Sequence, residues 1–508
     1  MNPKLFLVLF TLFIFQWSQT QNSIHAKLID STTQKPIAFA TIELNKKSGV
    51  ISNNNGVFQI YLNKKTRVND SLFINCLGYE TKRIAVEKFT DSIIVLSQKS
   101  IELDEVLVSN KAYTVDEIIE KAQENLATNY DFEYTKSRLF YRQSDHNNII
   151  KNTIAIKKST IPEINQKFVD SVLDIMPKNS GNYTELLGDL YLKPIAENAL
   201  KLDIIKASNL YDKNNEISFE GLEEKFNTIF KKHIKRDSYF KIKSGIFGTK
   251  EDIDSSFFGD AQADEDIEKT KAFIDEQKKK ENERKQNFLR YRKRAIANLE
   301  TSSFIFEDSF LNFLEKSNRY RFELLDYQFL NGEFVYKITF TPKRKEDFKG
   351  VLYINTDDFA IVRVDYENVK NLKNFRLLGI SYSEYLKKGT FIYAKNNSDK
   401  YVLKYAEVEN GNKFGIKRPL KIIEKNKHVK GRRKQNEIST DIHFIVSNIT
   451  KKELVVFENE SITETAFNNI TERAKVKPTY LPKYDPEFWK GYNVMEPNQA
   501  IKDFKSIE

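Results

Sequence analysis

Short runs of alternating apolar and polar residues dominate positions 22–109. Successive side chains of a strand point to opposite faces, so this alternation predicts strands with one buried face. Within 37–44, for example, Ala40, Ile42 and Leu44 share one face with Ala38. Turn residues separate the runs at intervals of roughly 8–12 residues, which is typical of a small β-sandwich. Seven short strands are predicted, in runs 24–29, 37–44, 50–62, 71–77, 82–86, 92–96 and 103–108.

The third run, VISNNNGVFQIYL at 50–62, holds a polar tip that is either a binding site or a turn. Asn and Gly tolerate the positive φ angles of a tight hairpin, so Asn54, Asn55 and Gly56 favour a turn. Phe58 and Ile60, together with Leu62, then return to the core face. Binding at the tip is kept as the alternative.

Positions 110–129 change to a helical period. Thr114 can cap a helix, and Glu117 completes a capping box three residues later. The residues at helical spacing form one apolar stripe: Val115, Ile118, Ile119, Ala122 and Leu126. We expect this helix to open a second domain.

Strand patterns return after the helix, first at 139–142 and 149–157 and later at 320–329, 333–340, 349–355 and 360–366. The later four predict a meander with turns at 331–332 and 357–358, and the first turn is an Asn-Gly hairpin signal. Between these groups, 259–300 is highly charged, with a thin apolar stripe of Phe288, Ala295 and Leu299. It predicts an exposed helix, or a partly disordered excursion that becomes helical and docks. The turn-rich, aromatic last 30 residues are expected to pack on the sheet.

The predicted fold class is mainly β with some α: an N-terminal seven-stranded sandwich, then a larger α+β domain on an extended antiparallel sheet. The predicted divisions are a signal peptide (1–21), the sandwich (22–109), a helix plus strands (110–258), the charged excursion (259–300) and a β-rich region with an aromatic tail (301–508). A chain of 508 residues with 38 Phe and 24 Tyr can build such cores.

The first 21 residues indicate export. Lys4 precedes an apolar run at 5–15, and a polar segment follows at 16–21. This run is too short to span a bilayer, which takes about 20 residues, and it fits a secretory signal peptide. An uncleaved anchor is the alternative. The lone cysteine, Cys76, lies far from the run, which excludes lipidation there, and one cysteine allows no internal disulfide.

Four elements of the first unit resemble the carboxypeptidase regulatory-like domain, a transthyretin-like β-sandwich. They are residues 35–40 (KPIAFA), 53–58 (NNNGVF), 71–79 (SLFINCLGY) and 103–108 (LDEVLV). Asn replaces the usual acidic residue before Gly56. The resemblance implies a secreted or outer-membrane bacterial protein, because the family often follows a signal peptide and also forms N-terminal extensions of TonB-dependent receptors. The remainder resembles uncharacterised β-rich C-terminal regions of such envelope proteins.

No catalytic, cofactor-binding or metal-ligating residue is predicted. His25, His146, His233, His428 and His443 do not occur in zinc peptidase motifs. Cys76 alternates with Leu72 and Ile74, so a core thiol is expected. Asp252 and Asp254 lack the pattern of a calcium loop, as do Asp264 and Asp266.

The formal charge is +10, from 81 basic and 71 acidic residues. Export makes nucleic acid an unexpected partner, and an anionic lipid or glycan fits better. One candidate anionic-ligand patch is predicted, and a solvated loop is its alternative. Its residues are Lys425, Lys427, Lys430, Arg432, Arg433 and Lys434.

These features favour an exported envelope protein of a Gram-negative-type bacterium, in the periplasm or on the outer-membrane surface. It would act without enzymatic activity as a binding or interaction module for a protein partner, glycan or lipid. In one variant, the extended sheet cups an acyl chain. The alternatives are a glycan-acting hydrolase of unfamiliar type and a structural subunit of an outer-membrane complex. No transmembrane helix is expected after signal cleavage, and the sequence leaves the oligomeric state open.

Overall fold

The computed structural model describes residues 23–45, 48–62, 66, 69–90, 92–99, 113–193, 200–212, 225, 228–235, 238–245, 247–252, 283, 287–330, 332–428, 433–473 and 476–506. The chain forms two compact units. The first comprises residues 1–102, 329–333 and 485–498, and the second comprises 103–328, 334–484 and 499–508. The predicted signal peptide and the predicted strand at 103–108 lie outside the described residues.

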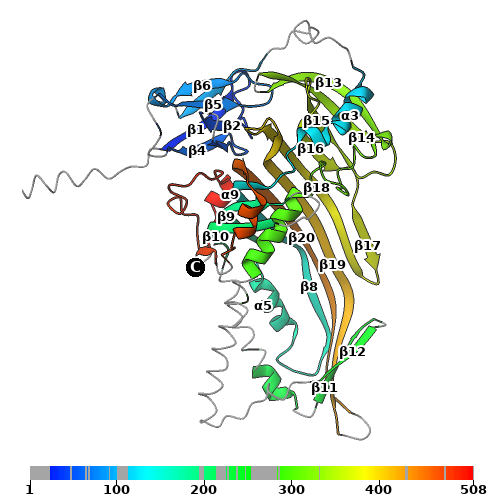
Figure 1. The fold of residues 1–508 in the computed structure, drawn as a ribbon. Coiled ribbons are helices and arrows are strands. Elements are labelled where there is room, and N and C mark those ends of the chain that lie inside the picture. Colours follow the sequence, from blue (N-terminus) through cyan, green and yellow to red (C-terminus); the bar gives the residue numbers. More distant parts are fainter. Residues whose placement is uncertain are drawn as a thin grey trace, which may run out of the picture. The chain divides into compact units, whose positions relative to one another are not determined.

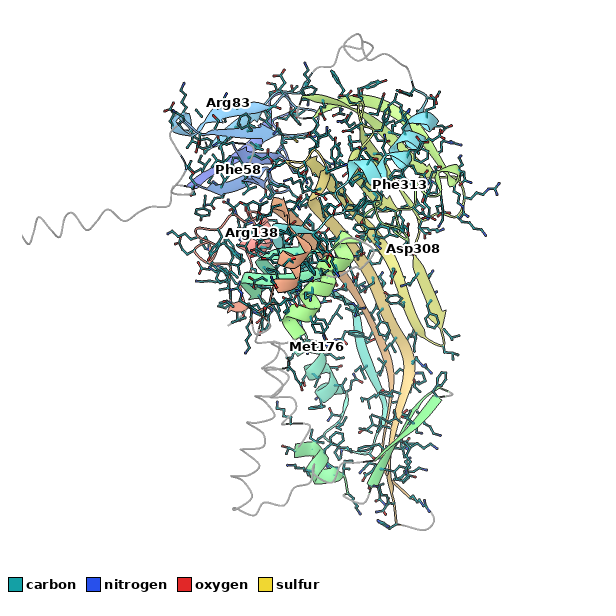
Figure 2. All side chains as sticks on the ribbon, viewed as in Figure 1. Phe58, Arg83, Arg138, Met176, Asp308 and Phe313 are labelled. Atoms are coloured by element: carbon teal, nitrogen blue, oxygen red, sulfur yellow. The ribbon has the colours of Figure 1, made fainter. Side chains whose placement is uncertain are left out.

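The first unit contains a β-sandwich. One sheet has the order β4-β1-β7 and the other β3-β2-β5-β6 (Figure 1). These seven strands represent six of the seven predicted runs, because the run 50–62 contributes to both β3 and β4. Their bounds are β1 Ser23–Asp30, β2 Thr41–Leu44, β3 Ser48–Ile51, β4 Val57–Tyr61, β5 Ser71–Asn75, β6 Lys82–Ala85 and β7 Ile93–Leu96, with a short 3-10 helix at Val86–Lys88. Phe58, labelled in Figure 2, is completely buried, as are Leu28 and Ile42.

One strand of the sandwich is shorter than predicted. The run 37–44 was expected to be extended throughout, but β2 begins only at Thr41. Phe39 has a φ of 59°, and extended backbone cannot continue through that conformation. Ala40, Ile42 and Leu44 are buried as predicted. Cys76 is buried, as expected for a core cysteine.

The tip at 53–56 is a turn. Gly56 has a φ of 74°, and a Cβ there would lie 2.5 Å from the Leu28 carbonyl oxygen. Asn53 Oδ1 accepts from the backbone N–H groups of Asn55, at 2.9 Å, and Val57, at 3.0 Å. The Asn53 amide also donates to backbone carbonyls of the 485–498 segment. This part of the aromatic tail therefore belongs to the first unit, whereas the tail was expected on the large sheet.

The second unit is built on one large sheet. In the described residues, fourteen strands form it, in the order β13-β14-β15-β16-β18-β19-β20-β8-β9-β10-β21, with β11, β12 and β17 added at the side. The strand bounds are β8 Thr135–Ser159, β9 Asn179–Leu192, β10 Leu200–Leu210, β11 Ser238–Ser244, β12 Phe247–Asp252, β13 Tyr320–Leu330, β14 Glu333–Pro342, β15 Phe348–Asn355, β16 Ile361–Asn368, β17 Lys373–Leu377, β18 Ile380–Lys395, β19 Tyr401–Asn426, β20 Lys434–Ser461 and β21 Thr479–Leu481.

The predicted meander is confirmed, because β13, β14, β15 and β16 are neighbours in chain order. The prediction of two separate strands at 139–142 and 149–157 is wrong, since β8 runs unbroken through both. The polar stretch between them stays extended because β20 pairs with it on one side and β9 on the other. Hydrogen bonds to two neighbours hold a strand that its own sequence does not favour.

Helices occupy the remaining described parts of the second unit. They are α3 Val115–Glu124, α4 Leu126–Asn129, α5 Gln166–Ile175, α8 Glu464–Asn469 and α9 Gln499–Lys502, with a 3-10 helix at Ser317–Arg319. The capping box of α3 is present, with Thr114 and Glu117 as predicted. Residues 228–233 and 287–300 are also helical. Of the described helices, none combines the length and apolar character that a membrane crossing requires.

The docking helix predicted at the end of the charged segment is confirmed at 287–300. Its apolar side is buried at Leu289, Ala295, Ile296 and Leu299. Arg292 fixes this helix to β8 by donating to Gln143 Oε1 at 2.9 Å. The chain then continues into an aromatic core, in which the Phe304 and Phe313 ring centroids are 5.7 Å apart. Phe313, labelled in Figure 2, is completely buried.

Candidate functional site

A cavity of about 290 Å³ lies in the second unit, between residues 297–306 and the large sheet. We call it the helix cavity. Its walls come from the end of the 287–300 helix, the segment that follows it, the chain before and within β8, and strands β9, β10, β18, β19 and β20. A water molecule takes about 30 Å³ of liquid, so the cavity has room for roughly ten waters or a ligand of similar size.

The cavity wall is mainly apolar. Val402 and Val456 are buried side chains of adjacent strands, and Leu200, Leu403 and Phe306 complete this part of the lining. Tyr393 and Tyr401 add aromatic faces, and both phenols are engaged outside the cavity. Tyr393 shares a short hydrogen bond with Ser303, and the Tyr401 hydroxyl donates to Asp358 at 3.0 Å. These aromatic rings therefore present apolar surface to a ligand.

The wall also holds charged side chains, from Asp131, Glu133 and Lys193, and two of its polar residues have unusual surroundings. Burial raises the pKa of the Glu300 carboxyl to about 7, because the apolar surroundings disfavour its charged form. Asn459 of β20 lies opposite Ser137 of the neighbouring strand β8, and its amide donates to the Ser137 hydroxyl at 2.9 Å. The Asn459 Oδ1 atom is buried and, among the described residues, has no hydrogen-bond partner.

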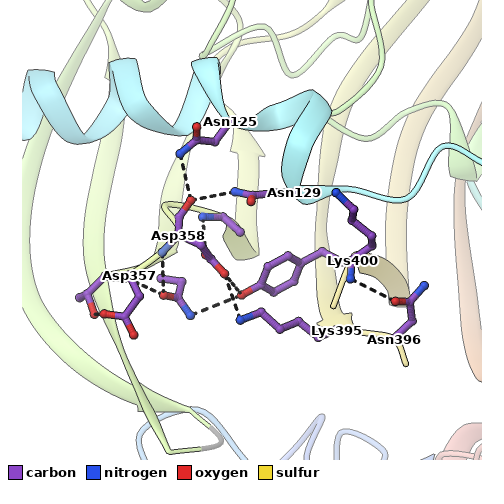
Figure 3. Close-up of polar contacts among 11 residues, drawn as sticks. Asn125, Asn129, Asp357, Asp358, Lys395, Asn396 and Lys400 are labelled. Carbon is purple, nitrogen blue, oxygen red and sulfur yellow. Dashed lines mark hydrogen bonds and ion pairs between the residues drawn. The ribbon is translucent and has the colours of Figure 1, made fainter. Parts of the chain in front are cut away.

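A polar network centred on Asp358 fixes the side of the cavity formed by Tyr401 (Figure 3). The Asp358 carboxylate pairs with Lys395 at 3.0 Å and accepts the Tyr401 hydroxyl. Its backbone carbonyl accepts from Asn125 at 3.1 Å and Asn129 at 2.8 Å. The turn between β15 and β16 is thereby joined to α3, α4 and β19.

The same network holds the chain that leads into β8. Asn396 donates to Asp131 Oδ2 at 2.8 Å, and Asp131 lines the helix cavity. Lys400 donates to the carbonyl oxygen of Thr128. Because these contacts join loops that are far apart in sequence, the cavity wall is preorganised rather than assembled from mobile side chains.

The anionic-ligand patch predicted from sequence lies elsewhere in the second unit. Lys425 is near the end of β19, and Lys434 opposite it begins β20. Like charges placed directly across a ladder repel. Lys434 forms an ion pair with the buried Glu437, which Lys421 also contacts at 3.0 Å.

Lys427 and Arg433 are exposed near the same strand ends, while Lys430 and Arg432 lie outside the described residues. The structure thus brings Lys425 and Lys434 together, and the patch itself stays a prediction. In the described part of the chain, no three His, Cys, Asp or Glu residues are grouped as metal ligands.

Sequence reasoning did not nominate the helix cavity. Its lining residues are spread from 131 to 459 and form no motif. The one available signal was Glu300, a carboxylate directly after the buried Leu299 in an amphipathic helix. A charged residue at such a boundary is usually solvated, so the signal by itself is weak.

Comparison with known proteins supports the assignment of the first unit. Residues 24–108 match the CarboxypepD_reg-like domain family. The first unit therefore contains a CarboxypepD_reg-like domain, in agreement with the resemblance seen in the sequence. No curated protein matches the chain closely enough to count as a relative.

Two solved structures are similar to much of the chain. One is a domain assigned as an outer membrane lipoprotein-sorting protein from Vibrio parahaemolyticus, with 11% identity, covering 70% of this chain and 97% of that one, at a TM-score of 0.21. The other is a LolA superfamily protein from Nitrosomonas europaea, with 11% identity, covering 70% of this chain and 98% of that one, at a TM-score of 0.16. At TM-scores this low, the similarity indicates nothing about the function of this chain.

Proposed function

We propose that this chain is an exported cell-envelope protein without enzymatic activity, whose second unit binds a small amphiphile in the helix cavity. The observation that carries the proposal is a preorganised cavity of about 290 Å³ whose wall is more apolar than polar and includes the carboxyl group of Glu300, together with the charged residues Asp131, Glu133 and Lys193. Ligand pockets are typically concave, mostly apolar and equipped with a few polar groups that orient the ligand. The CarboxypepD_reg-like domain of the first unit would serve as an interaction module.

The cavity chemistry defines the ligand class. The apolar wall favours an alkyl or small aromatic portion, and its volume limits the ligand to about ten non-hydrogen atoms. Glu300 accepts hydrogen bonds when ionised and can donate when protonated. A neutral head group with a hydroxyl or amide donor suits both states. A carboxylate head group would be repelled by ionised Glu300.

The test compares 1-octanol with octanoate by isothermal titration calorimetry at pH 6 and pH 8. Octanol is expected to bind at both values. Octanoate binding is expected to weaken by about tenfold from pH 6 to pH 8, as Glu300 loses its proton. An Ala297→Phe variant places a ring in the cavity and should abolish both. Arg290→Phe, on the exposed side of the same helix, should leave both unchanged.

Absence of octanol binding to the unmodified protein would refute the assigned ligand class. Equal octanol affinity in Ala297→Phe and Arg290→Phe would place the binding site outside the helix cavity. Circular dichroism and the melting temperature of both variants establish that a loss of binding does not come from misfolding.

A further inference from the structure

Strand β17 is exposed along its whole length, although two of its five residues are apolar. It pairs with β18 alone and forms a hairpin at the side of the large sheet. Phe375 is 48% exposed, Leu377 is 56% exposed and Leu378, in the turn, is 49% exposed. Such side chains usually face a core. Here they are exposed together at and beside the turn between β17 and β18, and the β18 end of this turn also pairs with β19.

The backbone conformation of the turn between β17 and β18 is unfavourable for Leu378. Leu378 and Gly379 connect the two strands, with φ angles of 48° and 79°. Glycine suits its position, because a Cβ on Gly379 would lie 2.2 Å from the Lys417 carbonyl oxygen. A two-residue turn with positive φ strongly prefers Asn or Asp before the Gly. Neither backbone preference nor core packing therefore accounts for leucine at 378, and strain of this kind points to function.

A second apolar tip lies beside the first. Phe247 is 54% exposed and begins β12, directly after the turn from β11. Arg418 of β19 contacts both hairpins. Its guanidinium donates to the Ser244 carbonyl at 2.5 Å and lies 5.1 Å from the centroid of the Phe247 ring. Its side-chain stem passes Gly379, whose hypothetical Cβ would be 2.7 Å from Arg418 Cγ.

The surroundings of these two tips are basic. Arg376, Lys417 and Lys243 are exposed on β17, β19 and β11. None of the three forms an ion pair within the described part of the chain. Glu384, an acidic residue of β18, already forms an ion pair with Lys373 at 3.0 Å. The apolar tips thus emerge from a surface with uncompensated positive charge.

We propose that Phe375, Leu377, Leu378 and Phe247 insert into the headgroup layer of an anionic phospholipid surface. Aromatic and aliphatic side chains bury into the interface, while nearby Lys and Arg attract anionic headgroups. Exposed apolar side chains among exposed basic ones complement an anionic lipid surface, which offers acyl chains and negative headgroups together. This inference is independent of what occupies the helix cavity.

The test measures co-flotation of the purified full chain with vesicles of phosphatidylcholine containing 30 mol% phosphatidylglycerol (about one anionic lipid in three). Binding is expected to these vesicles and to be weak on pure phosphatidylcholine. Leu378→Asn should reduce the bound fraction by at least about fivefold, because an inserted apolar side chain is lost. The melting temperature should stay equal or rise, because Asn accommodates a positive φ.

The matched control is Leu325→Asn, which changes a leucine of similar exposure (55%) on β13. It should bind vesicles like the unmodified chain. Residues outside the described part contribute equally to vesicle binding in both variants. Lys417→Glu should lower binding only on phosphatidylglycerol vesicles. Equal binding of Leu378→Asn and Leu325→Asn would overturn the proposal, as would self-association in analytical ultracentrifugation that Leu378→Asn abolishes.

Discussion

The buried carboxyl of Glu300 makes the stability of the second unit depend on pH in a direction opposite to that of most carboxylates. Its pKa is raised from the ordinary value of 4.5 to about 7 by burial. The folded state therefore holds the proton more tightly than the unfolded state. Below pH 4.5 the group is neutral in both states and costs nothing. As the pH rises from there through 7, the unfolded state loses its proton first, and the folded state becomes less stable.

The magnitude follows from the pKa difference of about 2.5 units, at about 1.4 kcal/mol per unit. Ionised Glu300 thus lowers the free energy of unfolding by about 3 kcal/mol once the pH exceeds 7. Glu300→Gln cannot ionise, so it should be more stable than the unmodified protein by about 3 kcal/mol at pH 8 but by less than about 1 kcal/mol at pH 5. Urea unfolding at half-unit intervals from pH 5 to pH 8 measures this difference.

Glu315→Gln serves as the control, since it changes an exposed carboxyl shortly after the same helix. It should leave the pH dependence unaltered. The reasoning is refuted if the stability difference between Glu300→Gln and the unmodified protein is the same at pH 5 and pH 8. That result would mean that Glu300 is solvated in the folded state.

Three further changes test other parts of the structure. Gly56→Val should lower the free energy of unfolding by about 3 kcal/mol, through positive φ and collision with the Leu28 carbonyl, measured by urea denaturation. Asp358→Ala should cost about 1–2 kcal/mol by releasing Tyr401 from the cavity wall, and it should weaken octanol binding in calorimetry. The pKa of Asp30 is held well below its usual range, first by the Thr33 backbone N–H and then by the Gln98 amide. Its stabilising effect is present above pH 4 and lost on acidification, so Asp30→Asn should flatten the fall in melting temperature between pH 4 and pH 2.

A specific result would contradict each of these three predictions. Gly332 has a φ of 94° with no atom within 4 Å of a hypothetical Cβ, so Gly332→Asn should be nearly neutral. A loss there as large as in Gly56→Val would show that steric collision is not the cause. Unchanged octanol affinity in Asp358→Ala would separate the polar network from the cavity. A parallel acid response of Asp30→Asn and the unmodified chain would remove Asp30 as the source of acid sensitivity.

Local structure could be read from the sequence where one short segment contains all of its determinants. The turn at Gly56 needs only residues that tolerate positive φ, and the capping box of α3 needs only Thr114 and Glu117. The Asn-Gly signal before β14 likewise acts within four residues. These features are governed by backbone preference and by hydrogen bonds between near neighbours. None of the three required knowledge of the rest of the chain.

Longer elements were predicted less well because neighbours decide them. β8 remains extended through a polar stretch only because β9 and β20 pair with it, and β20 begins 275 positions after β8 ends. The sequence contains no local signal for such a pairing. Phe39 illustrates the converse, because a residue that favours strands adopts a positive φ there and delays the start of the predicted strand to Thr41.

By itself, the sequence determined the β-sandwich, its CarboxypepD_reg-like pattern and the meander of the second unit, since alternation and turn chemistry act over a few residues. Only the tertiary structure decided the strand order of the large sheet and the helix cavity that encloses Glu300. It also brought the Leu378 turn and Phe247 to either side of Arg418. Burial and proximity depend on contacts between distant segments, and those contacts set both the pKa of a carboxyl group and the exposure of an apolar tip.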